Sequence, residues 1–293
     1  MNIQNILIPL DLSDNDSKQL QATRLMASCS DLVRVELLHV QPMYAESDII
    51  AKTRNELEKA QIDLIKLLDN PDIEVNQSVR FGEPAAEILQ VMDETDTDLV
   101  VLNSHGHGAA YHAFIGSTAQ RLLRDISTPA LILPKQLNRI PSELSQISVG
   151  VDFGQGTKKL VLEAEMLAKR CEASLHFIHL RNPPDALTGA GLTADFTPQL
   201  IHEAILEGMK SNIIKISETL DPELVHHATF QAEFGNPAKD LVLECAKSGS
   251  DLILIASHGH GRTFDLLIGS VAQGIIQRSS LPVLLMPSDK EME

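Results

Sequence analysis

The fold is decided by Asp251-Leu-Ile-Leu-Ile-Ala256 and by Ser257-His-Gly-His-Gly261, which follows it directly. After Asp251, residues 252–256 are apolar and include two β-branched isoleucines, which predicts a short buried strand. Gly269-Ser270 comes next, and residues 271–278 carry apolar side chains at helical spacing. The glycines therefore occupy a loop between a buried strand and the N-terminus of a helix.

The same pattern occurs once more, 153 positions earlier, where residues 98–103 lead into Ser104-His-Gly-His-Gly108 and then Gly116-Ser117. The offset between matching segments is 141 at Asn5 and Gln146, and 153 at Phe81 and Phe234. Repeats of this length indicate two copies of one structural unit. We infer two homologous halves, with an insertion in the second half at residues 182–197 that forms either a lid or a tolerated surface loop.

Each half alternates predicted strands and helices. In the first half we expect strands at 5–10, 33–40, 74–80, 98–103 and 129–133, and helices at 14–28, 47–69, 84–95 and 117–125. In the second half, a helix at 198–219 follows the insertion. This order predicts an α/β fold made of two repeated, doubly wound, parallel five-stranded sheets. We expect a first domain at 1–137, a second at 145–293, and a linker around 135–145.

Composition narrows the class of protein. Apolar residues make up 43% of the 293 residues, charged residues 22% and aromatic residues 3%, which predicts globular domains with aliphatic cores. The net charge of −16 disfavours nucleic acid and anionic membranes as partners. It leaves room for a small phosphate ligand, because backbone amides at a helix N-terminus bind anions without a basic patch.

The cysteines and the N-terminus suggest a cytoplasmic protein. Cys29, Cys171 and Cys245 show no Cys-x-x-Cys spacing, so we expect buried free thiols rather than a disulfide framework or a zinc ribbon. The first residues run straight into a strand without a cationic leader, and no apolar run reaches the length of a membrane span.

Polar residues gather where the predicted strands end. Asp11 and Asp152 follow the first strand of each half, and His39 and His179 lie near the end of the second strand. Ligands of open parallel sheets bind at this carboxyl edge, so we expect one pocket in each half. The carboxylates could accept hydrogen bonds from ribose hydroxyls or hold a metal ion.

The glycine loops have the spacing of an anion site. Nine residues separate Gly106 from Gly116-Ser117, and nine separate Gly259 from Gly269-Ser270. Free amides and the helix dipole behind the second glycine favour a phosphate. The alternative is that the glycines only permit a tight turn and that the two serines are N-caps.

This layout resembles the universal stress protein family, as a tandem pair covering nearly the whole chain. Nucleotide-binding members of that family carry Gly, two residues, Gly, nine residues, and then Gly-Ser or Gly-Thr. The second and third glycines match in both halves, whereas Asn103 and Ala256 stand where the first glycine would be. Ala256 is a mild change, and Asn103 could either block the ligand or form a hydrogen bond with it.

The resemblance implies a Rossmann-like, adenine nucleotide alpha hydrolase-like fold, and it implies ATP, with or without Mg²⁺, as the ligand. The binding residues that it implies are Pro9, Asp11, Val40, Asn103, Gly106, Gly116, Ser117 and Thr118 in the first half, and Asp152, Leu180, Ala256, Gly259, Gly269, Ser270 and Val271 in the second.

Other chemistry has weaker support in the sequence. No Gly-x-x-x-x-Gly-Lys-Ser/Thr motif is present, so the chain has no P-loop lysine. Histidines in the glycine loops could ligate zinc, although loop histidines more often pack or bind backbone groups. These minor metal candidates are His105, His107, His258 and His260. We expect no catalytic residues, and at most slow ATP hydrolysis.

We therefore expect a cytoplasmic tandem universal stress protein that binds adenine nucleotide in one or both halves and regulates or senses a stress response. Two alternatives stay open, a protein-interaction module with degraded pockets and a slow ATPase. The apolar fifth strands at 130–133 and 283–286 would be exposed edges unless they are paired. In the family such edges pair between two domains, which implies an intramolecular pseudo-dimer here, with a homodimer as a further option.

Overall fold

The computed structural model describes residues 1–13, 15–44, 46–106, 115–125, 127–154, 156–183, 198–257 and 268–287. The first half contains β1 (Asn5–Pro9), α1 (Asp16–Ala27), β2 (Arg34–Gln41), α2 (Ser47–Leu68), β3 (Glu74–Phe81), α3 (Pro84–Glu94), β4 (Leu99–Asn103), α4 (Ser117–Asp125) and β5 (Ala130–Leu133). The second half contains β6 (Gln146–Gly150), α5 (Thr157–Cys171), β7 (Ser174–Arg181), α6 (Pro198–Ser217), α7 (Pro222–Val225), β8 (Ala228–Phe234), α8 (Pro237–Lys247), β9 (Leu252–Ala256), α9 (Ser270–Arg278) and β10 (Val283–Met286).

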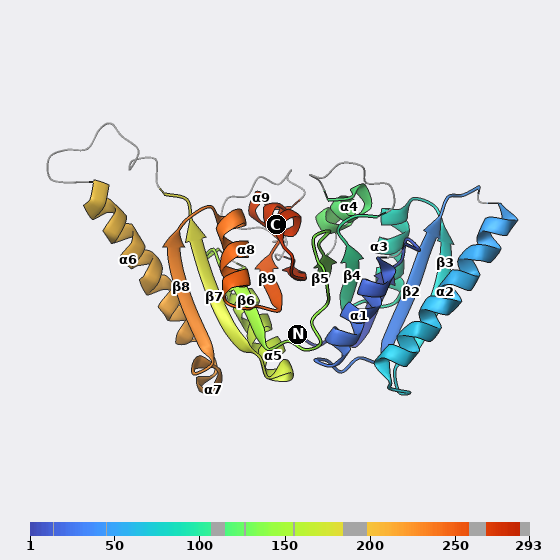
Figure 1. Ribbon diagram of the computed structural model, residues 1–293, viewed down its shortest axis with the longest axis horizontal. Helices are drawn as coiled ribbons and strands as arrows, with labels where there is room; N and C mark the ends of the chain where they lie inside the picture. The colour runs from blue at the N-terminus through green and yellow to red at the C-terminus, as the bar shows by residue number, and fades with distance from the viewer. Residues whose placement is uncertain are drawn as a thin grey trace.

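The strands of the described residues form one continuous sheet in the order β3-β2-β1-β4-β5-β10-β9-β6-β7-β8. Within each half all neighbouring strands are parallel, as the sequence predicted. The two halves meet where β5 pairs antiparallel with β10, with Leu131 opposite Leu284. Figure 1 shows the two halves side by side, with β5 near the junction. The expected pairing of the fifth strands is confirmed, and it merges the two five-stranded sheets into one.

Apolar side chains cover both faces of this sheet because residues along each strand alternate between the faces. In β1, Ile6 and Ile8 belong to the apolar cluster under α1, α2, α5 and α6, whereas Leu7 belongs to the cluster under α3, α4, α8 and α9. Both clusters contain residues from both halves, so the core continues across the junction. Among the described helices, none is long and apolar enough to cross a membrane.

A disulfide joins the two halves on the α1 and α5 side of the sheet. Cys29, just after α1, is bonded to Cys171 at the end of α5, with Cα atoms 5.0 Å apart. An ion pair of 2.6 Å between Arg170 and Asp31 lies next to it. The expectation of free thiols is therefore wrong for this pair, because the sequence spacing gives no sign that two helix ends meet. Cys245 is free and buried, as expected, and burial raises the pKa of its thiol to about 12.

Candidate functional site

The glycine loop of the first half touches the loop that follows β1. A Cβ atom added at Gly106 would lie 2.9 Å from Oδ2 of Asp11, so any side chain there would require the Asp11 carboxylate to move. The absence of a side chain at Gly106 thus lets the Asp11 carboxylate lie against the glycine loop at the carboxyl edge, where β1 and β4 are neighbours. This contact brings together two residues that the sequence placed 95 positions apart.

Gly116 closes the first loop and starts α4. Its amide donates to the carbonyl oxygen of Ser104 at 2.8 Å, and its own carbonyl accepts from the amide of Gln120 at 2.8 Å. Gly116 thus takes the N-cap position, and Ser117 is the first helical residue. The first amides of α4 cannot be satisfied within the helix, so they suit an anion.

The second half repeats this arrangement. The amide of Gly269 donates to the carbonyl oxygen of Ser257 at 2.9 Å, and its carbonyl accepts from the amide of Gln273 at 2.9 Å. Gly269 is the N-cap of α9, and no side chain caps the helix. The alternative that Ser117 and Ser270 are N-caps is therefore wrong, since both are first helical residues.

Asn103 is committed to a hydrogen bond inside the protein. Its amide nitrogen donates to Gln19 at 2.7 Å. Gln19 is buried and donates in turn to the carbonyl oxygens of Pro9 at 2.9 Å and Val101 at 3.0 Å. The second half has Leu160 and Ala256 at the matching positions, an apolar pair in place of the polar one. In the first half, the residue in place of the family's first glycine is thus bonded to α1, the helix that follows β1.

The acidic residues after the first strand have different partners in the two halves. Asp11 accepts from the amide of Ser13 at 3.2 Å. Asp152 accepts from the amide of Gly154 at 2.9 Å and from the hydroxyl of Thr157 at 3.3 Å. The counterpart of Thr157 in the first half is Asp16. Burial, and then the nearby charge of Asp11, raise the pKa of the Asp16 carboxyl to about 7.

This raised pKa predicts how replacing Asp16 changes stability with pH. The folded state holds the Asp16 proton up to about pH 7, whereas the unfolded chain releases it near its usual value of 3.8. The stabilising contribution of Asp16 is therefore complete at low pH and is lost as the pH rises toward 7. Between pH 5 and 8, the free energy of unfolding of Asp16→Thr should rise relative to that of wild type by about 1–2 kcal/mol. This magnitude is reduced to allow for screening by solvent at the partly exposed carboxyl. Urea unfolding measures this, with the exposed Asp93→Asn as a control, and parallel curves for Asp16→Thr and wild type would contradict it.

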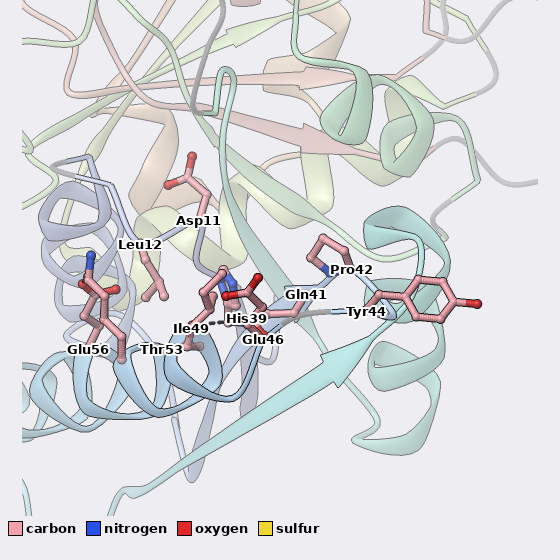
Figure 2. Close-up of a pocket in the computed structure, with 11 residues that line it drawn as sticks. Asp11, Leu12, His39, Gln41, Pro42, Tyr44, Glu46, Ile49, Thr53 and Glu56 are labelled. Carbon is pink, nitrogen blue, oxygen red and sulfur yellow. Dashed lines mark hydrogen bonds and ion pairs between the residues drawn. The ribbon is translucent and has the colours of Figure 1, made fainter.

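A cavity of about 550 Å³ opens beside Asp11 at the ends of β1 and β2 (Figure 2). Its walls include Leu12 from the loop after β1, His39 and Gln41 from β2, and Thr53 from α2. The His39 ring is held in place because its Nδ1 atom lies 2.8 Å from the carbonyl oxygen at residue 10. Asp11 and His39 were predicted from the sequence to line a pocket, whereas no motif marks the other nine residues that line this cavity.

The other residues that the sequence predicted to bind the ligand lie around the carboxyl edge of the sheet. Val40 and Leu180 lie on β2 and β7 with side chains toward the other face of the sheet from His39 and His179, respectively. Thr118 and Val271 belong to the first turns of α4 and α9.

His105 contacts the Ser104 hydroxyl at 2.9 Å through Nδ1. Within the described ranges, no group of three or more His, Cys, Asp or Glu side chains could hold a metal. Gly259, His107, His258 and His260 lie outside the described residues.

Comparison with known proteins identifies the family. The family model described as Universal stress protein family matches residues 2–134 and again residues 144–287. The chain belongs to this family. The two matches make it a tandem universal stress protein, as its internal repeat indicated.

Its relatives are distant in sequence. Universal stress protein Slr1230 of Synechocystis is 22% identical over 242 residues, which cover 80% of this chain and 70% of that protein. Universal stress protein Rv2319c of Mycobacterium tuberculosis is 23% identical over 237 residues, which cover 78% and 77%. A crystal structure of a universal stress protein from Archaeoglobus fulgidus covers 99% of this chain and 98% of its own, with a TM-score of 0.70 and 19% identity. This likeness supports the α/β fold of the universal stress proteins over the whole chain.

Proposed function

We propose that this universal stress protein binds an adenine nucleotide at the carboxyl edge of its sheet and responds to it as a regulator or sensor. The position of Asp11 carries the proposal. Asp11 lines the cavity, and its carboxylate also lies against Gly106 of the glycine loop. A ligand that fills the cavity and reaches the start of α4 passes Asp11 on the way.

The chemistry along this path fits the three parts of a nucleotide. Leu12, Pro42 and Ile49 give the cavity apolar walls, and His39 and Gln41 add polar groups, a combination that suits a purine base. The Asp11 carboxylate can accept hydrogen bonds from ribose hydroxyls. The first amides of α4, at Ser117 and Thr118, can bind the phosphates.

The charges of the cavity support this orientation. Asp11, Glu46 and Glu56 line it against a single lysine, Lys52, which pairs with Glu56 at 3.7 Å. This excess of carboxylates repels phosphates, so they are better placed at the helix N-terminus than in the cavity. Mg²⁺ bound to the phosphates would lower their charge beside Asp11.

Binding of ATP with and without Mg²⁺, measured by isothermal titration calorimetry, tests the proposal, with GTP as a competitor. Gly116→Val should weaken binding at least about tenfold, because its branched side chain stands against the phosphates. A Cβ atom at Gly116 would meet the Ser104 carbonyl oxygen at 3.5 Å, an ordinary contact, so we expect the variant to fold. Gly208→Ala is the matched control, since its added Cβ would meet nothing within 4 Å.

Two outcomes would reject this function: wild-type protein that binds no ATP with Mg²⁺, or Gly116→Val that binds as tightly as wild type. Phosphate release, measured in the same samples, separates the binding function from slow ATP hydrolysis.

Exposed apolar side chains favour a protein-interaction module as the second candidate. Met43 is 66% exposed, Ile49 is 52% exposed and Tyr44 is 96% exposed, beside the mouth of the cavity. Figure 2 shows the Tyr44 ring pointing away from the other lining residues. Such a patch suits a partner surface, and absence of nucleotide binding would favour this function.

A further inference from the structure

The two halves share two local features around their candidate pockets, a left-handed residue after the aspartate and an anchored histidine. Leu12 and Phe153, the residues after Asp11 and Asp152, have φ angles of 59° and 60°. Both backbones are left-handed, which is rare for residues with a Cβ atom, so the two side chains leave the chain in the same direction. His39 and His179 are anchored alike, because each Nδ1 atom lies 2.8 Å from the carbonyl oxygen of the residue just after β1 or β6.

What differs is the side chain that faces the histidine. In the first half, Leu12 and His39 both line the cavity of about 550 Å³ (Figure 2). In the second half, the Phe153 ring packs edge-on against the His179 ring, with centroids 4.6 Å apart and planes at 60°. His179 is only 8% exposed. The aromatic ring thus covers the imidazole that corresponds to the one lining the cavity in the first half.

We propose that Phe153 closes the nucleoside subsite of the second half and that Leu12 keeps that of the first half open, so the chain binds one nucleotide, in its first half. This inference rests on the proposed function for the identity of the ligand. It makes the residue after each strand-end aspartate a specificity-determining residue.

The backbone allows the two residues to be exchanged. Leucine and phenylalanine each already occupy this left-handed conformation in one half, so neither swap adds backbone strain that the site does not already carry. A phenylalanine at position 12 would enter the cavity, whereas a leucine at position 153 would uncover His179. Circular dichroism and thermal melting establish that each variant is folded before binding is measured.

Stoichiometry of ATP binding tests the inference. We expect one ATP for each wild-type chain, none for Leu12→Phe and two for Phe153→Leu. Leu243→Phe, the same exchange at an exposed position of α8, is the matched control and should bind like wild type. Adding Gly269→Val to Phe153→Leu should return the stoichiometry to one ATP per chain, because the opened site of the second half uses the start of α9.

A readout without ligand separates failure of this inference from failure of the proposed function. Diethyl pyrocarbonate modifies accessible imidazoles, and peptide mass spectrometry locates the modified histidines. In folded protein, His39 should react in wild type and be protected in Leu12→Phe, whereas His179 should react only in Phe153→Leu. If the histidines react in this pattern but no variant binds ATP, the proposed nucleotide function is wrong, whereas the inference that Phe153 closes the subsite of the second half is supported.

The inference is overturned if wild type binds two ATP molecules, or if its single ATP is lost on Gly269→Val and kept on Gly116→Val. It is overturned equally if His179 reacts as readily as His39 in folded wild-type protein.

Discussion

Replacing Cys29 and Cys171 together by alanine is expected to lower the free energy of unfolding by about 2–5 kcal/mol. The disulfide joins residues 142 positions apart and links one half of the chain to the other. A cross-link that closes so long a loop restricts the unfolded chain strongly, so its removal favours unfolding. The neighbouring Arg170–Asp31 ion pair offers little compensation, since pairs near the surface contribute only about 0–1 kcal/mol.

Urea unfolding with and without dithiothreitol measures this effect. Reductant should lower the stability of wild type toward that of the double variant and should leave the double variant unchanged. Thiol titration supplies an independent check: folded protein should show none, denatured protein one, from Cys245, and reduced denatured protein all three. Equal stability of wild type and variant under oxidising conditions would show that the disulfide does not stabilise the fold.

Leu131→Asp at the junction of the two halves is expected to cost at least about 4 kcal/mol of unfolding free energy. Leu131 is completely buried and lies opposite Leu284 in the antiparallel β5–β10 pair. Both residues belong to the apolar cluster that runs through the two halves. A carboxylate there would be buried among aliphatic side chains, so it must either stay charged at high cost or take up a proton.

Leu131→Met is the matched control, since a side chain of similar volume should cost less than about 1.5 kcal/mol. Equilibrium unfolding at pH 7 compares the two variants with wild type. A Leu131→Asp protein within about 1 kcal/mol of wild type would mean that the junction is not a buried part of the fold in solution.

The secondary structure of this chain was predictable because its local signals agree with its tertiary environment. The helix expected at 47–69 is observed as Ser47–Leu68, since its apolar spacing matches the face that α2 buries. The pairing of the fifth strands was also predictable, because two fully apolar short strands must be covered. Because the two halves are repeats, the strands and helices predicted in one half could also be assigned in the other.

What the sequence did not reveal depends on distances between remote residues. The Cys29–Cys171 bond requires the ends of α1 and α5 to meet, and this follows only from the way β5 and β10 join the halves. The partner of Asn103 is Gln19, 84 positions away in the chain. The contrast between Leu12 and Phe153 becomes informative only when each is placed beside a histidine, His39 in the first half and His179 in the second. The proposed ligand contacts remain predictions.

Because β5 pairs with β10, the sheet can be completed only after most of the chain has been translated. Leu131 of β5 finds its partner Leu284 only after 153 further residues have been made. At translation rates of about 5–20 residues per second, that interval is roughly 8–30 s. Until β10 has been made, the apolar edge of β5 has no partner strand from the second half. We therefore expect the nascent chain to be most prone to aggregation during this interval, until β10 is available to pair with β5.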